Sequence, residues 1–461
     1  MAVPDVAGEC FLVLGLARSG CAAGALLRRH GAMVIGYDDA PEADLRAVWA
    51  ARGLTDTAAA AFDELRSGGD AAGLAQRRLA GVVLSPGFPP DHELVTALRA
   101  RAPLYGELEW AARFCAACLV GITGTNGKTT TTELVAHLAR GSGWQAHALG
   151  NVGRPLSQLA DQLGPEALAV LEVSSFQLET IEKFRPQVAV VLNLEPDHLD
   201  RYPDVRSYWA AKRRLVEALP PAGQYVTWTA CPEARRWPSP RAPILFGERS
   251  EGATTWVEER RLCCAWGGGV HDLAAIDALR LRGAPNLLNA CAAVATLLAL
   301  GADPLALAKS LRHFRGLPHR QQVVARRGGV VFVDDSKGTN VAAVAAGLAG
   351  YERDVVLIAG GRGKGEDYGR LRAALGPVKA VVVMGEEAPA IAAAVKGATH
   401  VARAEGMSEA VAMAASLAEP RGTVLLSPAC ASFDMFRDYA ERGAAFTSAA
   451  LAGGAEPEES S

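Results

Sequence analysis

Short runs of apolar residues alternate along this chain with longer stretches in which apolar and charged positions are mixed. The apolar runs end in a glycine, a small residue or an acid, which is typical of buried strands in a parallel sheet. The strands predicted from this pattern lie at residues 11–14, 33–37, 82–84, 119–122, 168–173, 188–192, 330–333, 355–359, 380–384 and 424–426. Strands that alternate with helices in this way predict an α/β protein.

The predicted strands fall into three blocks, each of which opens with an apolar run. A length of 461 residues agrees with three domains, since a domain has roughly 150 residues. We place the domains at residues 1–109, 110–316 and 317–454. The acidic segment Ala455-Glu-Pro-Glu-Glu-Ser-Ser461 is expected to be a disordered tail.

The composition excludes several classes of protein. The 47 basic and 50 acidic residues nearly cancel, which gives no sign of a nucleic-acid partner. No run of roughly 18 apolar residues and no signal-peptide pattern is present, so we expect a cytoplasmic protein without membrane contact. The odd number of cysteines indicates reduced thiols, and Cys115 and Cys118 lack the second pair that a zinc site needs.

The most informative motif is Gly124-Thr-Asn-Gly-Lys-Thr129, which follows a predicted strand and precedes a helix predicted at 130–140. The glycines permit a tight loop whose N–H groups converge on anionic oxygens. Lys128 would reach the β- and γ-phosphates of a nucleotide, and the Thr129 hydroxyl would reach Mg²⁺. Ile122 occupies the first glycine position of the usual motif, so this is a variant of it. Glycines that serve packing alone are the alternative.

The first block begins like a dinucleotide-binding domain. Gly15 and Gly20 follow its first strand, and Asp38 follows the second. The usual fingerprint G-x-G-x-x-G is incomplete, because Ala17 stands at the second glycine. We therefore predict a Rossmann-type domain for some nucleotide. The turn Ser85-Pro86-Gly87 after the third strand either lies beside that ligand or merely ends the strand.

Acidic residues and a histidine follow two neighbouring strands of the second block. Glu172 ends one strand, and Asp197, His198 and Asp200 follow the next. Residues at the carboxyl ends of parallel strands face the ligand crevice of an open α/β sheet. Glu172 is therefore a candidate Mg²⁺ ligand, and His198 either binds metal or ligand or caps a helix.

Lys212 lies on the apolar side of a predicted helix at 208–219. At about 100° per residue it projects near the centre of an arc formed by Trp209, Leu215, Val216 and Leu219. A lone buried ammonium group is costly, so this lysine must pair, lose its proton or be chemically modified. Snorkelling of the amine to the surface is the alternative.

Basic and glycine-rich turns mark the third block. Lys337 lies in the turn Asp334-Asp-Ser-Lys-Gly-Thr-Asn340 after a predicted strand, where it could neutralise charge on a transferring phosphoryl group. A surface turn would have a similar composition. Together with Gly316-Leu-Pro-His-Arg320 and Gly360-Gly-Arg-Gly-Lys364, however, this turn favours an anionic ligand.

Six segments, found in order along nearly the whole chain, resemble the Mur ligase family. They are Gly124-Thr-Asn-Gly-Lys-Thr129, Leu171-Glu-Val-Ser-Ser-Phe-Gln-Leu-Glu179, Asp197-His-Leu-Asp-Arg-Tyr202, Gly316-Leu-Pro-His-Arg320, Asp335-Ser-Lys-Gly-Thr-Asn340 and Leu426-Ser-Pro-Ala-Cys-Ala-Ser-Phe-Asp434. The resemblance implies a Rossmann-like N-terminal domain for a UDP-sugar, a central P-loop ATPase domain with a mostly parallel sheet, and a Rossmann-like C-terminal domain that closes over the site.

The reaction that the resemblance implies is an ATP-driven amide ligation. The L-alanyl carboxylate of UDP-N-acetylmuramoyl-L-alanine would attack the γ-phosphate, and the amine of D-glutamate would then displace phosphate from the acyl phosphate. The implied cofactors are ATP, two Mg²⁺ ions and a carbamate on Lys212, and the implied state is a monomer. Another Mur-type or folylpolyglutamate-type ligase and a nucleotide-binding regulator without turnover are the alternatives.

The resemblance also assigns site residues. The catalytic ones are Lys128, Glu172, His198, Lys212 and Lys337, and the metal ligands are Thr129, Glu172, His198 and the Lys212 carbamate. The nucleotide contacts are Gly124, Thr125, Asn126, Gly127, Lys128, Thr129, Thr130, Asn286, Arg320, Asp335 and Lys364. The substrate contacts that it assigns are Arg18, Ser19, Asp38, Asn151, His198, His319, Lys337, Thr339, Ser432 and Phe433, and the turn after the third strand adds Gly87. This sequence departs from the family's pattern at two positions. One is Arg18, and the other is Pro285, because in the family a histidine often precedes the asparagine that corresponds to Asn286.

Overall fold

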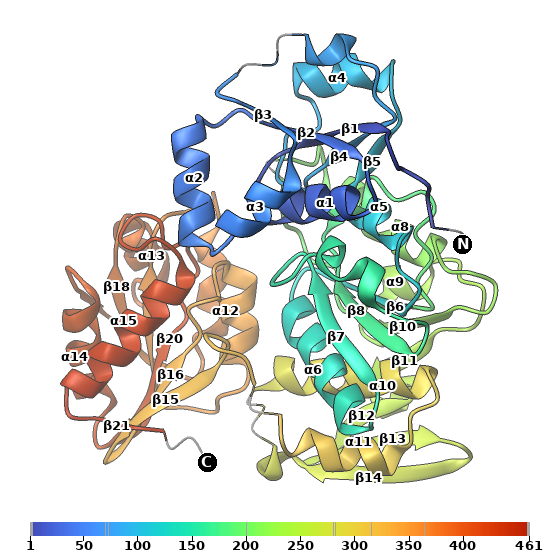
Figure 1. The fold of residues 1–461 in the computed structure, drawn as a ribbon. Coiled ribbons are helices and arrows are strands. Elements are labelled where there is room, and N and C mark those ends of the chain that lie inside the picture. The colour runs from blue at the N-terminus through green and yellow to red at the C-terminus, as the bar shows by residue number, and fades with distance from the viewer. Residues whose placement is uncertain are drawn as a thin grey trace. The chain divides into compact units, whose positions relative to one another are not determined.

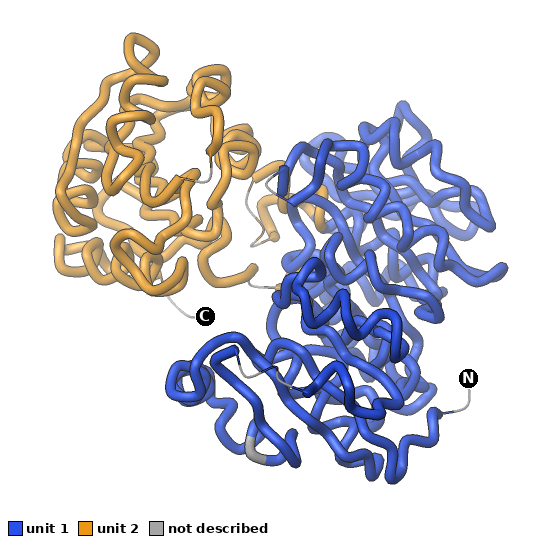
Figure 2. Tube along the Cα trace, turned by 90° about the horizontal axis from the view of Figure 1, so that it is seen from above, with its two compact units in different colours: residues 1–274, 290–311 blue, residues 275–289, 312–461 orange. Residues whose placement is uncertain are grey.

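The computed structural model describes residues 3–69, 71, 73–199, 201–279, 281, 283–314, 316–363 and 365–458. The chain divides into two compact units (Figure 2). Unit 1 contains residues 1–274 and 290–311, and unit 2 contains residues 275–289 and 312–461.

Unit 1 begins with a parallel sheet in the order β3-β2-β1-β4-β5. Its strands are β1 (Cys10–Leu14), β2 (Met33–Asp38), β3 (Glu64–Ser67), β4 (Gly81–Leu84) and β5 (Leu104–Gly106). Its helices are α1 (Arg18–Arg29), α2 (Glu42–Ala51), α3 (Thr55–Ala61), α4 (Glu93–Arg99) and α5 (Glu107–Ala112). Gly24 lets α1 approach α3, because a Cβ there would lie 2.8 Å from the Ala61 carbonyl oxygen.

A larger sheet follows in the order β14-β13-β12-β11-β10-β9-β6-β8-β7 (Figure 1). Its strands are β6 (Cys118–Thr123), β7 (Gln145–Gly150), β8 (Ala167–Glu172), β9 (Val188–Val191), β10 (Gln224–Trp228), β11 (Ile244–Gly247), β12 (Thr255–Glu258), β13 (Arg261–Trp266) and β14 (Gly269–Ala275). The pairs from β7 to β12 are parallel, and β13 is antiparallel to β12. The helices of this part are α6 (Lys128–Gly141), α7 (Ser175–Leu178), α8 (Val205–Glu217), α9 (Pro232–Arg235), α10 (Ala284–Ala299) and α11 (Pro304–Leu311).

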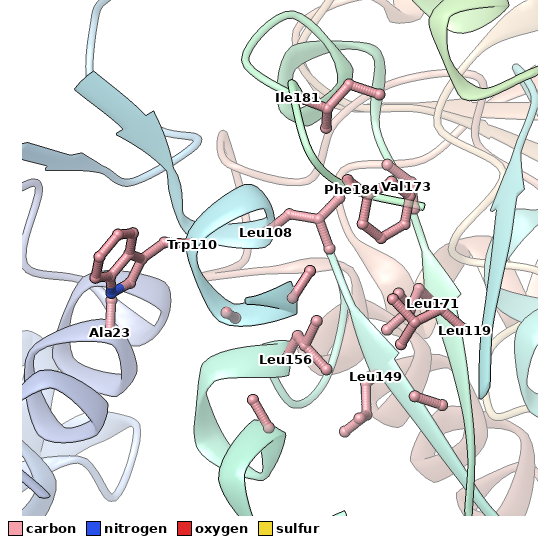
Figure 3. Packing of buried hydrophobic residues seen from close by; sticks show 14 of the residues in the cluster. Ala23, Leu108, Trp110, Leu119, Leu149, Leu156, Leu171, Val173, Ile181 and Phe184 are labelled. Atoms are coloured by element: carbon pink, nitrogen blue, oxygen red, sulfur yellow. The ribbon is translucent and has the colours of Figure 1, made fainter. Parts of the chain in front are cut away.

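One hydrophobic core joins the two sheets of unit 1. Ala23 of α1 and Trp110 of α5 belong to the same cluster of buried residues as Leu119 of β6 and Leu171 of β8 (Figure 3). The large apolar area that this cluster removes from water stabilises the first two predicted domains as a single compact unit.

Unit 2 contains a sheet in the order β19-β18-β17-β20-β16-β15-β21. Its strands are β15 (Gln322–Arg327), β16 (Gly329–Asp334), β17 (Val355–Gly360), β18 (Val378–Met384), β19 (His400–Arg403), β20 (Arg421–Leu426) and β21 (Glu456–Pro457). The strands from β19 to β16 are parallel, whereas β15 is antiparallel to both β16 and β21. The helices are α12 (Val341–Leu348), α13 (Ala388–Val395), α14 (Met407–Ala418) and α15 (Tyr439–Ala452).

The α/β fold predicted from the sequence is confirmed, and each strand predicted there coincides with a strand of the structure. The prediction of a disordered tail from residue 455 was wrong for its first residues. Strand β21 pairs with β15, and the Glu458 amide donates to the Val324 carbonyl over 3.1 Å. An ion pair between Arg326 and Glu458 adds to this pairing, so the acidic composition that suggested disorder is neutralised locally. In the described part of the chain, no helix is both long and apolar enough to cross a membrane.

Candidate active site

The segment from Gly124 to Gly127 forms a tight loop between β6 and α6, as predicted. Gly127 has a φ of 85° and Gly124 a φ of 153°. Residues that carry a side chain rarely adopt such backbone angles. A Cβ on Gly124 would also approach the Leu192 Cβ atom to 3.0 Å. The loop ends at the N-terminus of α6, and the positive end of a helix dipole favours an anion.

Lys128 is the first residue of α6, and its side chain folds back over the loop. Its Nζ atom donates hydrogen bonds to the carbonyl oxygens of Gly124 and Thr125, both over 2.8 Å. The ammonium group therefore lies against the loop that the sequence assigns to phosphate. Contact of this group with a nucleotide stays a prediction.

Glu172 lies at the carboxyl end of β8, the strand next to β6 in the sheet, and it pairs in register with Ile122. Its side chain is buried, and Oε1 accepts a hydrogen bond from the Asn151 amide over 3.2 Å. The other oxygen, Oε2, has no hydrogen-bond partner among the described residues. An unpaired buried carboxylate oxygen is costly, and a divalent cation that prefers oxygen ligands would satisfy it.

The loop after β7 connects Glu172 to the N-terminal part of unit 1. The Asn151 N–H donates to the Glu172 carbonyl over 2.9 Å, and Gly150 takes a φ of 112° that allows this approach. Arg18 at the start of α1 donates to the Gly153 carbonyl over 2.7 Å. Asn151, which the sequence assigns to the substrate, is thus placed between the candidate metal ligand and the first domain.

His198 lies in the segment between β9 and α8, with a φ of 54°. Its exposed imidazole lies between aromatic rings, with centroid distances of 5.0 Å to Phe176 and 5.7 Å to Tyr208. The alternative that His198 caps a helix is wrong, because Asp204 is the N-cap of α8. The imidazole ring of His198 is therefore accessible to a ligand. Asp200, which the sequence placed in the same segment, lies outside the described residues.

Lys212 is buried on α8, as the helical projection predicted, and its side chain is 1% exposed. Its Nζ atom donates to the Gly124 carbonyl over 2.9 Å and lies 4.5 Å from the centre of the Tyr208 ring. The snorkelling alternative is therefore wrong. Burial, and then the nearby positive charge of Lys128, hold the pKa of the Lys212 amine well below its usual range.

A lowered pKa favours the neutral amine, which is the form that reacts with CO₂ to give a carbamate and a proton. Among the described residues, no three His, Cys, Asp or Glu side chains gather as a metal-binding group. Glu172 alone would thus supply little of the coordination that Mg²⁺ needs. Mg²⁺ usually keeps waters and substrate phosphate oxygens as ligands, so one carboxylate with an unpaired oxygen still fits this metal.

Two of the residues assigned to the amino-acid substrate lie close together in unit 2. His319 has a φ of 62°, and its Nδ1 atom donates to the buried carboxylate of Asp334 over 2.7 Å. The Nζ atom of Lys337 lies 3.2 Å from the Tyr439 hydroxyl and 4.6 Å from the centre of that ring. Asp334 orients the imidazole and Tyr439 the ammonium group, so both become fixed hydrogen-bonding groups.

Arg442 connects the loops that carry these residues. Its buried guanidinium group donates to Ser336 Oγ and O and to the carbonyl oxygens of Cys430 and Ala431, over 2.8–3.1 Å. Burial lowers its pKa to about 10, so it stays charged at neutral pH. Arg442 was not predicted, because a lone arginine, here in the first turn of α15, gives no signal in the sequence.

The other assigned residues of unit 2 lie on turns and at the start of α10. Ser432 is buried, whereas Phe433 is 63% exposed. The Thr339 N–H donates to the Lys337 carbonyl over 2.9 Å, and Asn286 lies in the first turn of α10. Lys364 lies outside the described residues.

In the N-terminal domain, Asp38 closes the first βα turn. Its carboxylate accepts hydrogen bonds from the backbone N–H groups of Leu16 and Ala40, over 2.7 and 3.0 Å. Ser19 lies in the first turn of α1, the helix that follows β1. Gly87 follows β4, and a Cβ there would meet nothing within 4 Å. The open space at Gly87 is compatible with the ligand that the sequence places there.

A small cavity of about 20 Å³ lies next to the Ser85-Pro86 turn, between the N-terminal domain and the segment after β8. It is lined in part by Gln177 and Arg201. The Nε2 atom of Gln177 is buried without a hydrogen-bond partner among the described residues. Gln177 belongs to one of the six segments that resemble the family, and its unpaired amide nitrogen is a polar group that a ligand in this cavity could contact.

Asp335 is buried in unit 2, which raises the pKa of its carboxyl to about 6. The charged form is destabilising, so the contribution of this carboxyl to stability is fully present below the unfolded pKa of about 3.9 and is lost as pH rises through 6. We expect Asp335→Asn to remove this fall and to stabilise the protein at pH 8 by about 2 to 3 kcal/mol. Thermal unfolding at pH 4.5 and pH 8, with the exposed Asp91→Asn as control, measures it; equal effects of Asp335→Asn at both pH values would contradict it.

Comparisons with known proteins identify relatives over nearly the whole chain. Residues 122–297 match the family model for the Mur ligase middle domain, and residues 319–430 match that for the Mur ligase, glutamate ligase domain. The chain is 39% identical over 455 residues to UDP-N-acetylmuramoylalanine–D-glutamate ligase of Pelotomaculum thermopropionicum, covering 96% of this chain and 97% of the relative. It is 42% identical over 464 residues to the ligase of the same name from Anaeromyxobacter dehalogenans, covering 97% and 98%.

Solved structures share the fold. UDP-N-acetylmuramate-alanine ligase MurC of Thermotoga maritima aligns over 96% of this chain and 100% of its own, with a TM-score of 0.62 and 19% identity. MurF ligase of the same organism, solved with ADP, aligns over 87% and 90%, with a TM-score of 0.56 and 18% identity. The fold defines an α/β protein with three mostly parallel sheets. The sequence identities go further, and the chain belongs to the Mur ligase family.

Proposed function

We propose that this chain is an ATP-dependent ligase that joins D-glutamate to the L-alanyl carboxylate of UDP-N-acetylmuramoyl-L-alanine, a step of peptidoglycan precursor synthesis. The observation that carries this proposal is 39–42% identity over nearly the full length to ligases named for that reaction. Residues 1–109 would bind the UDP-sugar, residues 110–316 ATP, and residues 317–454 the amino acid.

The first half-reaction transfers a phosphoryl group. An oxygen of the L-alanyl carboxylate attacks the γ-phosphorus, the bond to the β-phosphate oxygen breaks, and ADP leaves. Lys128, at the phosphate loop, would neutralise charge on the β- and γ-phosphates, and His198 would contact the acceptor. Little covalent chemistry is asked of the protein, so its contribution is positioning and charge neutralisation.

Two Mg²⁺ ions would be held by Thr129, Glu172, His198 and a carbamate on Lys212, and would supply positive charge to the phosphate oxygens. The unpaired Oε2 atom of Glu172 supports this assignment. Burial of the Lys212 amine supports the carbamate, because the modification turns a destabilising buried base into an anionic ligand.

The second half-reaction forms the amide. The amine of D-glutamate attacks the acyl carbonyl carbon, the bond to the phosphate oxygen breaks, and the amine loses a proton. His319, Lys337, Thr339, Ser432 and Phe433 would surround D-glutamate, and Asn286, Arg320, Asp335 and Lys364 the nucleotide. The network of Asp334 with His319 and of Tyr439 with Lys337 supports this by providing two fixed polar groups for an anionic amino acid.

A phosphate-release assay tests the function. The purified chain is incubated with UDP-N-acetylmuramoyl-L-alanine, ATP and Mg²⁺, and with D-glutamate, L-glutamate, L-lysine or meso-diaminopimelate in turn. We expect rapid release with D-glutamate alone, and a ligated product by mass spectrometry. Release that depends on another amino acid would favour a different ligase of the family, and no amino-acid-dependent release would favour a regulator.

We also infer that the chain works in the cytoplasm as a monomer, without a nucleic-acid partner. The near balance of basic and acidic residues supports the last point. Sedimentation at several protein concentrations would measure the mass in solution, and a dimer at micromolar concentration would contradict a monomer.

A further inference from the structure

The phosphate loop is held to the segment that follows β9 by hydrogen bonds beyond the end of the sheet. The regular pairing of β6 with β9 ends at Thr123 and Val191. Past that point the Thr125 N–H donates to the Asn193 carbonyl over 3.1 Å. The Thr125 hydroxyl donates to the Glu195 carbonyl and accepts from the Glu195 N–H, over 3.1 and 3.0 Å.

The side chain of Asn193 continues this ladder where the loop turns away from the sheet. Its Oδ1 atom accepts from the Asn126 N–H over 2.8 Å, and its Nδ2 atom donates to the Asn126 carbonyl over 3.0 Å. Both atoms of the amide therefore bind the backbone of a single loop residue, as a neighbouring strand would. The side chains that could do this must offer a donor and an acceptor side by side.

This two-point contact fixes the loop before a nucleotide arrives. The Gly124 carbonyl on the same loop accepts from both Lys128 and Lys212, so the loop is held from two directions. A loop held in one conformation loses less entropy when it binds phosphate. The segment that begins at Asn193 also leads within a few residues to His198, so the contact joins the phosphate loop to the predicted acceptor side of the site.

We propose that Asn193 is a positioning residue that presets the phosphate loop and fixes its place relative to the segment carrying His198. This inference rests on the function proposed above. It assigns to Asn193 no contact with substrate, since the side chain acts through the backbone of Asn126.

The chain offers a matched control at the opposite end of the same two strands. Gln187 lies just before β9, and its Oε1 atom accepts from the Leu119 N–H over 2.6 Å. Gln187→Ala thus removes a side-chain to backbone hydrogen bond between the same strands, away from the phosphate loop. It should lower the melting temperature as Asn193→Ala does, and leave the kinetic constants unchanged.

The test compares Asn193→Ala, Asn193→Asp and Gln187→Ala with the wild type in full-length protein. We expect Asn193→Ala to weaken Mg-ADP binding in calorimetry and to raise the KM for ATP by roughly tenfold, since two hydrogen bonds are lost. The KM for D-glutamate should not change. Asn193→Asp keeps the acceptor but sets a carboxylate against the Asn126 carbonyl, so it should be impaired at least as strongly.

The outcomes separate this inference from the proposed function. If the wild type shows no D-glutamate-dependent phosphate release, the proposed function is wrong. Calorimetry with Mg-ADP then still tests whether the contact of Asn193 with Asn126 presets the phosphate loop. Nucleotide affinity of Asn193→Ala within twofold of wild type, with a melting temperature lowered as in Gln187→Ala, would overturn the inference and leave Asn193 a structural residue only.

Discussion

Replacement of Lys212 by methionine is expected to lower turnover by about a thousandfold while leaving the protein at least as stable as the wild type. Activity and stability move in opposite directions here because the two properties depend on the amine differently. Turnover needs the group that the Lys212 nitrogen would carry, whereas the folded state gains nothing from burying the nitrogen itself. Phosphate release at saturating substrates and thermal unfolding measure the two effects.

The stability part of this prediction follows from the contacts. Lys212 is buried, and its Nζ donates to the Gly124 carbonyl, which also accepts from Lys128. Removal of the Lys212 amine therefore leaves no orphaned carbonyl. Methionine has a similar length and an apolar end, so we expect a gain of about 1 to 3 kcal/mol in the free energy of unfolding at neutral pH.

The pH dependence of the free energy of unfolding tests the stability part of this prediction independently. The pKa of the Lys212 amine is well below its usual range in the folded protein, so the unfolded chain binds the extra proton at intermediate pH. The wild type, kept free of metal and bicarbonate, should therefore gain stability as pH rises toward the unfolded pKa of about 10.4. The Lys212→Met variant should lack this gain, which urea unfolding at pH 7 and pH 9.5 would measure.

A matched control is Lys183→Met, which makes the same chemical change at an exposed position of the same unit. It should alter neither turnover nor stability. Mass spectrometry of the wild type in bicarbonate should show the added mass of CO₂ on Lys212, and short carboxylic acids should partly restore the Lys212→Ala variant. A Lys212→Met enzyme with wild-type turnover would contradict a role for this amine in catalysis.

The sequence predicted most of the site in unit 1 because its residues lie at the ends of buried strands. Apolar runs identified β6, β8 and β9, and parallel strands bring their carboxyl ends to one edge. The placement of Glu172 beside the phosphate loop follows from that rule alone. The burial of Lys212 followed from helical periodicity, since one helix face meets the sheet.

The sequence could not predict contacts that depend on the position of a particular loop. Asn193 was not predicted as a site residue, because no periodicity shows that its amide meets Asn126. Arg442 was missed for the same reason, since its four hydrogen bonds join loops distant in sequence. The antiparallel strands β12 and β13 and the short strand β21 were not predicted either, because exposed and polar positions interrupt their apolar residues and leave only a weak alternating pattern.

Replacement of Glu172 by glutamine is the second change for which we expect a very large effect. The side chain keeps its length, and the Oε1 atom can still accept from Asn151, as it does over 3.2 Å in the structure. What changes is Oε2, the buried oxygen without a partner, which becomes an NH₂ group that cannot bind a cation. We expect turnover to fall by about a thousandfold, because the charge that stabilises the transferring phosphoryl group is no longer held in place.

The metal dependence tests the cause of this loss. In Glu172→Gln, calorimetry should show weakened binding of Mg-ADP and unchanged binding of ADP in EDTA. The free energy of unfolding without metal should not fall, since a buried charge has been removed. Retention of wild-type turnover and of wild-type Mg²⁺ dependence by this variant would contradict metal binding at Glu172.

Glu107 provides the matched control for this experiment. It is a second buried glutamate of unit 1, with Oε1 bonded to the N–H and hydroxyl groups of Ser157 and Oε2 without a partner among the described residues. Glu107→Gln makes the same chemical change in a similar environment on α5, so its turnover and Mg²⁺ dependence should match the wild type. Glu172→Asp should lie between wild type and Glu172→Gln, because its carboxylate keeps the charge but is withdrawn by one methylene from the place where the metal would bind. A graded loss at Glu172 and none at Glu107 would assign the effect to the position of the carboxylate, and equal losses at both would assign it to packing of the unit.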